Sequence, residues 1–206
     1  MAAAGPDPAL RRAVRWVAAL NLGYFGVEFA AALAIGSVAL FADSIDFLED
    51  ASVNLLILLA LGWSAAARAR LGMVLAAILL APGVATLWTA WEKVNSPVAP
   101  DPTALSVTGL GALAVNVICA VMLARHRTAG GSLSRAAFLS ARNDAFANLA
   151  IIGAGLGTAF VWRSAWPDVI VGLGIAAMNA GAAHEVFTAA REEHRSADLP
   201  DTGGRA

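Results

Sequence analysis

The feature that most constrains this chain is an apolar run of membrane-spanning length that contains four carboxyl side chains. The run is VALFADSIDFLEDASVNLLILLALGW, and its acids are Asp43, Asp46, Glu49 and Asp50. A carboxylate at the centre of a membrane helix costs about 2.5–3.5 kcal/mol on insertion scales. Four such groups need a counter-charge, a proton or a metal ion. The run therefore predicts a functional site inside a membrane helix.

The whole chain has the composition of a polytopic membrane protein. Of its 206 residues, 59% are hydrophobic and 14% are charged, whereas soluble domains have about 25% charged residues. Six apolar segments approach the ~20 residues needed to cross the bilayer core. They are Ala13–Ile35, Val38–Ser64, Leu71–Trp91, Thr103–Ala124, Leu133–Val161 and Pro167–Ala189. We expect an all-α protein with six transmembrane helices, the first being too long for a signal peptide.

The positions of the arginines predict the orientation of these segments. With a cytoplasmic N-terminus, the outer loops hold only Lys93 and Arg163. The inner side holds Arg11, Arg12, Arg15, Arg68, Arg70, Arg125, Arg127, Arg135, Arg191, Arg195 and Arg205. This positive-inside bias predicts that both termini are cytoplasmic. We divide the chain into a cytoplasmic N-terminal segment (1–12), a six-helix transmembrane domain (13–190) and a short disordered cytoplasmic tail (191–206). Arg-rich inner loops and Ala-rich helices fit the inner (plasma) membrane of a bacterium.

Three acids of the second segment share one helix face. Successive helical residues turn by about 100°, so Asp43, Asp46 and Asp50 fall within an arc of about 60°, with Glu49 at its edge. These carboxylates repel one another unless some are protonated or bridged by a cation. We expect Asp46 and Asp50 to be functional. Asp43 and Glu49 have two interpretations: solvated residues near the outer end, or a proton path or access route.

The fifth segment places another acid at membrane depth. Asp144 lies about eleven residues into it, close to mid-membrane at about 1.5 Å per residue. Ser140 precedes Asp144 by one turn and Asn148 follows it by one turn, on the same face, where Asn148 is a candidate for a proton path or access route. Arg142 points to the opposite side, where it can snorkel to the cytoplasmic surface; the alternative is an ion pair with an aspartate. In the first segment, the buried acid Glu28 is a candidate for a proton path or gate.

The remaining chemistry-bearing side chains have ordinary interpretations. The single cysteine, Cys119, excludes a disulfide within the chain and a CxxC metal cluster. Asn21 adds a polar group to the first segment, and Asn116 of the fourth segment has two interpretations, a hydrogen bond between helices or a ligand. The histidines lie near cytoplasmic ends, and we expect them to be surface residues.

Two of these motifs are similar to those of the cation diffusion facilitator, or cation efflux, family. GSVALFADSIDFLED resembles the family's second helix, which carries His or Asp, three residues and then Asp, here Asp46 and Asp50. The same spacing in the family's fifth helix is matched by Ser140 and Asp144 in SARNDAFANLAII. The segment WPDVIVGLGIAAMNAGAAHEVFTAAREE resembles the sixth helix, including its Pro-Asp start. The likeness covers nearly the whole membrane part.

The resemblance implies a divalent metal exporter that exchanges a cytoplasmic ion for protons by alternating access. Its tetrahedral metal site would be shared by the second and fifth helices, at Asp46, Asp50, Ser140 and Asp144. Ser140 replaces the usual His or Asp, so the site would hold only oxygen ligands, which suit Mn²⁺ better than Zn²⁺. We expect a transported ion of the Mn, Zn, Fe or Co class, no permanently bound cofactor and no nucleic-acid partner.

The family's cytoplasmic C-terminal domain has no counterpart in this sequence, so we expect a short form whose homodimer depends on membrane helices. The alternative to an antiporter is a transport-inactive scaffold or metal sensor, as Ser140 and Arg142 suggest. A membrane-embedded enzyme is disfavoured because no nucleophile–base pair or phosphate-binding loop accompanies the acids.

Overall fold

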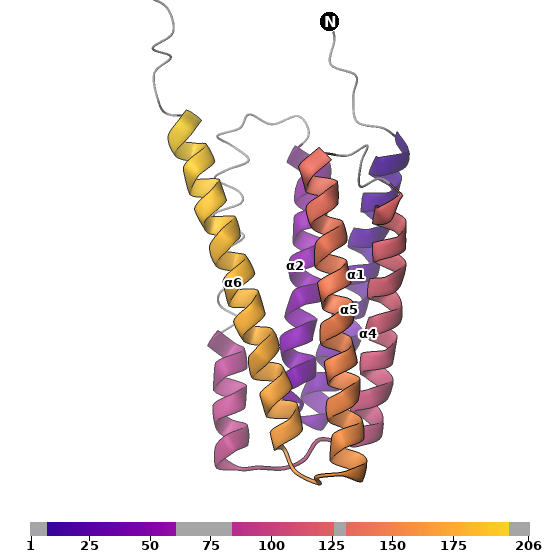
Figure 1. The fold of residues 1–206 in the computed structure, drawn as a ribbon, viewed down its shortest axis with the longest axis vertical. Helices are drawn as coiled ribbons and strands as arrows, with labels where there is room; N and C mark the ends of the chain where they lie inside the picture. Colours follow the sequence, from indigo (N-terminus) through magenta and orange to yellow (C-terminus); the bar gives the residue numbers. More distant parts are fainter. Residues whose placement is uncertain (1–7, 61–83, 126–130, 198–206) are drawn as a thin grey trace, which may run out of the picture.

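Six helices account for most of the described part of the chain. The computed structural model describes residues 8–60, 84–125 and 131–197. Its helices are α1 (Pro8–Ile35), α2 (Val38–Ala60), residues 84–95, α4 (Pro102–Ala124), α5 (Gly131–Phe160) and α6 (Trp166–Ala197). Consecutive helices run in opposite directions; α1, α2, α4 and α5 form a bundle, and α6 and the 84–95 helix lie beside it (Figure 1). These residues contain no strand, which confirms the all-α class.

The helix bounds differ from the expected ones mainly at the two ends of the chain. The first helix begins at Pro8, inside the segment 1–12 that was expected to precede it. The last helix continues to Ala197, into the segment 191–206 that was expected to be a disordered tail. Its last turns are rich in Ala, Arg and Glu, which are strong helix formers in water as well. The end of the second expected segment and the start of the third lie outside the described residues.

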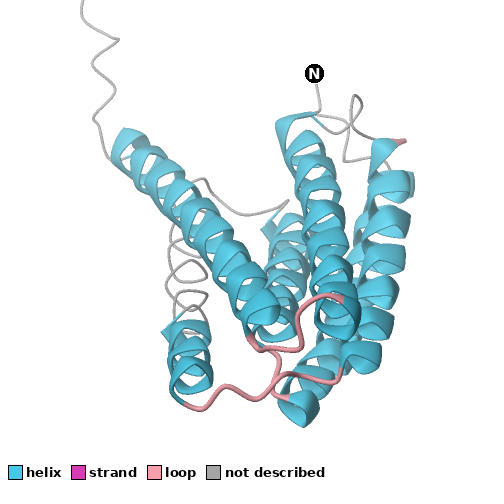
Figure 2. Ribbon diagram, turned by 60° about the horizontal axis from the view of Figure 1, so that its bottom comes forward, coloured by secondary structure: helices cyan, strands magenta, loops and turns pink. Residues whose placement is uncertain are grey.

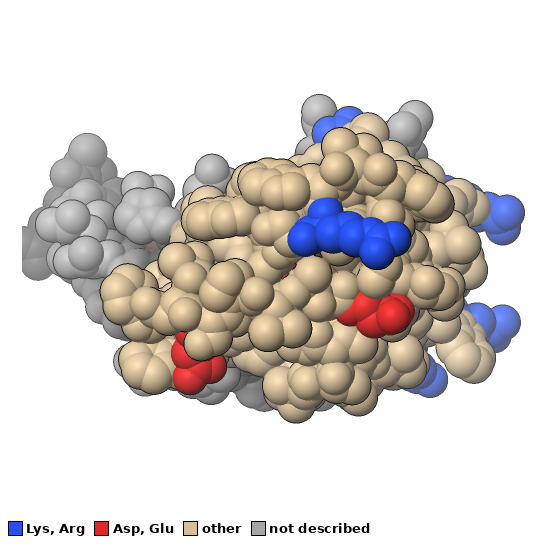
Figure 3. Space-filling view, turned by 90° about the horizontal axis from the view of Figure 1, so that it is seen from below, with Lys and Arg blue, Asp and Glu red and all other residues tan. Residues whose placement is uncertain are grey.

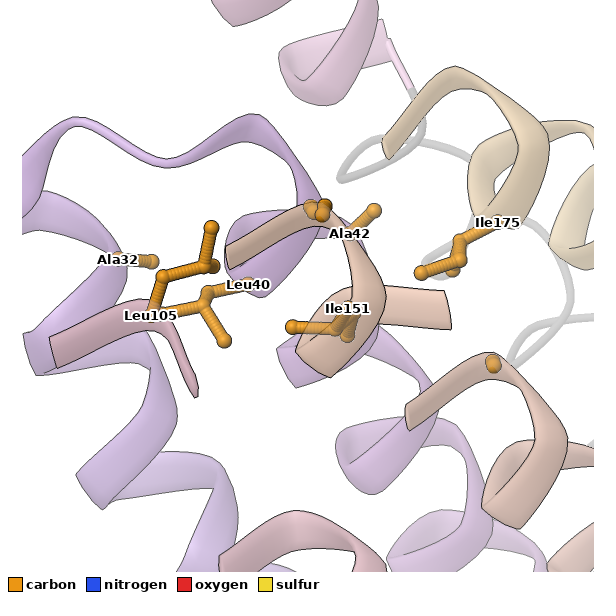
Figure 4. Packing of buried hydrophobic residues seen from close by; sticks show 9 residues of the cluster. Ala32, Leu40, Ala42, Leu105, Ile151 and Ile175 are labelled. Carbon is orange, nitrogen blue, oxygen red and sulfur yellow. The ribbon is translucent and has the colours of Figure 1, made fainter. Parts of the chain in front are cut away.

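Small residues allow the helices to approach closely at the core. Figure 4 shows the central cluster, which combines five helices through residues such as Ala32, Leu40, Leu105, Ile151 and Ile175. A Cβ added at Gly155 of α5 would lie 2.2 Å from the Ser106 Oγ atom and 3.1 Å from the Pro102 carbonyl oxygen of α4. The two helices therefore touch where a side chain is missing, as is common in membrane helices.

The outer surface of the bundle is apolar. By length and composition alone, α1 and α4 are suited to cross a membrane, and α6 is apolar over Trp166–Met178. The helix α2 is continuous, but its apolar sequence is interrupted by four acids. Trp88, Trp91 and Trp162 are exposed, and the face of the molecule near the 161–165 loop is mostly uncharged (Figure 3). Exposed apolar and Trp side chains of this kind fit contact with lipid and the membrane interface.

A carboxylate of α6 caps the start of α2. The Asp168 Oδ1 atom accepts a hydrogen bond from the Ser37 hydroxyl at 2.6 Å. Asp168 also accepts from the backbone N–H groups of Val38 at 2.9 Å and Ala39 at 3.2 Å. The Ser37 hydroxyl oxygen in turn accepts from the N–H of Leu40 at 3.1 Å. The first N–H groups of a helix have no partner within it, so α6 satisfies part of α2.

The end of the 84–95 helix joins the same junction through the Lys93 side chain. Lys93, which lies beyond the third expected span, donates to the backbone carbonyl of Gly36. Gly36 links α1 to α2 with a φ of +63°, a left-handed conformation that glycine adopts without a Cβ clash. Burial lowers the pKa of Lys93, and the charge of Asp168 opposes that change. An apolar cluster at this junction consists of Val38, Ala90 and Val169.

Candidate functional site

Acids of α2 and α5 meet between these two helices. The charge of Asp46 interacts with that of Asp144, and Asp144 also interacts with Asp50. Asp46 and Asp144 are partly buried, and Asp50 is only 9% exposed. The structure therefore brings together the three acids that the spacing and the family resemblance selected. Carboxylates from two helices at one place form an oxygen-rich site.

Side chains of α1 and α4 form a chain of hydrogen bonds that ends at one acid of this site. The Asn21 Nδ2 atom donates to the Asp50 Oδ2 atom at 3.4 Å. The Cys119 thiol donates to the Asn21 Oδ1 atom at 3.6 Å, and both side chains are fully buried. Cys119 is thus a buried free thiol. Asn21 orients one carboxylate of the site and extends the polar network to a third and a fourth helix.

Two asparagines stand one turn beyond the acids on their helices. Asn54 donates its Nδ2 to the carbonyl of Asp50 at 2.7 Å, and Asn148 donates to the carbonyl of Asp144 at 2.8 Å. In both asparagines the Oδ1 atom is buried and accepts no hydrogen bond from the described residues. A buried amide oxygen without a donor can accept from a bound water or bind a hard cation. Asn148 was expected to be part of a proton path or access route, whereas no role was predicted for Asn54.

Glu28 and Asp43 form a second acidic pair, between α1 and α2. Both side chains are fully buried, and the charge of Asp43 acts on Glu28. Within the described part of the chain, no residue donates a hydrogen bond to their four oxygens. Two carboxyl groups hydrogen-bond to each other only when one of them carries a proton. Asp43 is therefore not a solvated residue at the end of its helix.

The other expected site residues have different surroundings. Glu49 is partly buried, and its charge acts on Asp50 and Asp144. Arg142 is exposed and donates to the Asn143 Oδ1 atom at 3.3 Å, in agreement with a side chain directed away from Asp144. Ser140 lies within α5, but its side chain is outside the described part of the structure.

The acids between α2 and α5 do not enclose a closed metal site in this conformation. Among the side chains that the structure describes, no three from Asp, Glu, His or Cys are close enough together to hold a metal ion. Carboxylates that face one another repel when no cation lies between them.

The family comparison covers most of the chain. Residues 14–192 match the family of cation efflux transmembrane domains. The chain belongs to the cation efflux family. Members of this family are membrane-bound transporters of divalent cations, so the acids between α2 and α5 belong to a transporter. A comparison with curated proteins found no match.

One further candidate residue of this cation efflux protein, Asn54, could have been found from spacing. Asn54 follows Asp50 by one turn of α2, as Asn148 follows Asp144 by one turn of α5. The repeated pattern of Asp, three residues and Asn was visible in the sequence. The cap that Asp168 provides for α2 had no such signal, because its partners are about 130 residues away in the chain.

Proposed function

We propose that this cation efflux protein exports a divalent metal ion in exchange for protons. Asp46, Asp50 and Asp144 would bind the ion, and Ser140 or a bound water would supply a fourth oxygen. The observation that carries the proposal is the electrostatics of these acids. Among the described residues, the charges that act on Asp46 and Asp144 are those of other carboxylates. A divalent cation is the ligand that such a group of buried acids lacks.

The donor set favours a hard ion. Carboxylate, hydroxyl, amide and water oxygens suit Mn²⁺, whereas Zn²⁺ prefers sites with imidazole or thiolate ligands. The orphaned Oδ1 atoms of Asn54 and Asn148 add two more oxygens close to the acids. Fe²⁺, Co²⁺ and Zn²⁺ remain alternative substrates in this proposal, with Mn²⁺ preferred.

Proton coupling follows from the chemistry of the ligands. Carboxyl groups must lose their protons to bind a metal ion, and they take protons again when it leaves. The Glu28–Asp43 pair, in which the two groups can hydrogen-bond only through a shared proton, supports a proton path beside the metal site. Glu49, which is partly exposed, would form the access to the site together with Asn148.

The expected orientation is part of the proposal. Arg11, Arg12 and Arg15 are exposed near the start of α1, and Arg125 is exposed at the end of α4, which is the same end of the bundle (Figure 1). This distribution supports six crossings with both termini in the cytoplasm. We further propose a homodimer formed by membrane helices in a bacterial inner membrane.

Metal uptake into inverted vesicles that contain a pH-sensitive dye tests the function. We expect saturable Mn²⁺ entry with release of protons, and loss of both signals in Asp50→Asn and in Asp144→Asn. Asp101→Asn is the control, because Asp101 is an exposed cap at the start of α4. Transport that survives both site substitutions would exclude the proposed site. Metal binding without any transport by the parent protein would indicate a sensor or scaffold.

A further inference from the structure

The junction at the start of α2 indicates how α6 takes part in transport. We propose that Asp168 is a positioning residue that joins α6 to α2 at one end. The joint acts as a pivot, and α6 changes its distance from α2 only at the opposite end. The inference rests on the proposed function, because α2 carries Asp46 and Asp50. Asp168 itself would bind no metal.

The hydrogen bonds that Asp168 accepts stabilise the joint between α6 and α2. Asp168 is fully buried and accepts from one hydroxyl and two backbone N–H groups. Hydrogen bonds to a charged carboxylate are stronger than neutral ones. The positive end of the α2 dipole further stabilises the charge. Separation of the helices here would leave a buried carboxylate and two N–H groups of α2 without partners, so the joint stays closed.

Close contact between the backbones also holds α6 against α2 at this joint. Gly172 lies one turn after Asp168, and a Cβ added there would be 2.7 Å from the carbonyl carbon of Val38 and 2.8 Å from the N atom of Ala39. The backbones of α6 and α2 are therefore in direct contact. Val169 packs on Val38 in the same turn. Neither helix can slide along the other without losing both the contact and the cap.

Beyond the joint, α6 departs from α2. Figure 1 and Figure 2 both show α6 leaning away from the bundle toward its C-terminal end. Among the described side chains of α6, Ile175 is the last buried one, and Met178 is 53% exposed. Attachment at one end and separation at the other is the geometry of a hinge. Asp46 lies eight residues after Val38, about 12 Å along α2, so the joint positions the site without touching it.

The first experiment separates the joint from a simple helix cap. Asp168→Asn removes the carboxylate, and Ser37→Asp added to it supplies α2 with a cap of its own while α6 stays unattached. We expect a fall of at least about tenfold in kcat for Asp168→Asn, with KM for Mn²⁺ nearly unchanged. The double variant should regain thermal stability but not kcat, and Asp101→Asn should behave as the parent. Recovery of kcat in the double variant would overturn the proposal, as would a change in KM alone.

The second experiment does not depend on transport. Pairs of spin labels in a Cys119→Ala background measure the distance between helices at both ends. Phe41, partly buried near the start of α2, and Ile170 of α6 form one pair, and Leu55 of α2 and Met178 of α6, exposed farther along, form the other. We expect only the second distance to change between acidic and alkaline pH or on addition of Zn²⁺. A change near the joint as large as the other, or no change at either end, would overturn the inference.

The two experiments distinguish this inference from the proposed function. If vesicles with the parent protein take up no metal, the proposed function fails. The spin-label distances still decide whether α6 and α2 are joined at one end and free at the other.

Discussion

The contact between α6 and α2 at Gly172 leads to a prediction whose size can be worked out. A Cβ at this position would lie 2.7 Å from the carbonyl carbon and from the Cγ1 atom of Val38, whereas ordinary contacts begin at 3.4 Å. In Gly172→Ala the helices must therefore separate by about 0.7 Å (3.4 − 2.7). Overpacking of this kind costs about 1–3 kcal/mol. Alanine is the better helix former by about 1 kcal/mol, so the net destabilisation is about 0–2 kcal/mol.

Gly174→Ala is the matched control for this prediction. A Cβ at Gly174 meets no atom within 4 Å, so this variant gains helix propensity without a clash. The difference between the two variants isolates the clash, about 1–3 kcal/mol. In chains of this size 1 kcal/mol shifts Tm by about 2–4 °C, so Gly172→Ala should melt several degrees below Gly174→Ala. Thermal unfolding in detergent, followed by circular dichroism, measures both. Equal melting temperatures would refute the close approach of the two backbones.

Three further predictions concern the acids and the packing around them. Glu28→Gln keeps the shape of a protonated acid but cannot release a proton, so Mn²⁺ binding should persist while the pH dependence of transport becomes flatter. The same flattening in Glu92→Gln, at an exposed residue, would contradict a specific role. Ser140→His adds an imidazole ligand and should shift competitive uptake toward Zn²⁺; an unchanged preference would place Ser140 outside the site. Tyr24→Phe removes the 2.6 Å hydrogen bond to the Thr108 carbonyl and should cost about 0.5–1.5 kcal/mol in thermal unfolding.

The ends of the helices were predicted well where a turn or a proline in the sequence marks them. Gly36 and Ser37 separate α1 from α2, and the expected boundaries Ile35 and Val38 are confirmed. Pro102 starts α4, within one residue of the expected start. The end of α6 was missed because hydropathy marks where an apolar segment ends, whereas a helix continues for as long as its backbone propensity allows.

The candidate site was predictable in part. The four-residue spacing placed Asp46 and Asp50 on one face of α2, and the family resemblance paired them with Asp144. The pairing of Glu28 with Asp43 was not predictable, because it depends on the rotation of α1 about its own axis. Periodicity identifies the face of a helix but not the residue that faces it.

The cap of α2 also has a consequence for the order in which the protein is built. Synthesis proceeds from the N-terminus, and Asp168 is added 130 residues after Val38. Asp168 accepts a hydrogen bond from the N–H group of Val38. Until α6 enters the membrane, the first amide groups of α2 depend on Ser37 and on water at the membrane surface. The helix α2, which carries Asp46 and Asp50, is therefore completed only by a helix made much later. A ribosome-bound chain that ends before α6 would hold an unfinished α2.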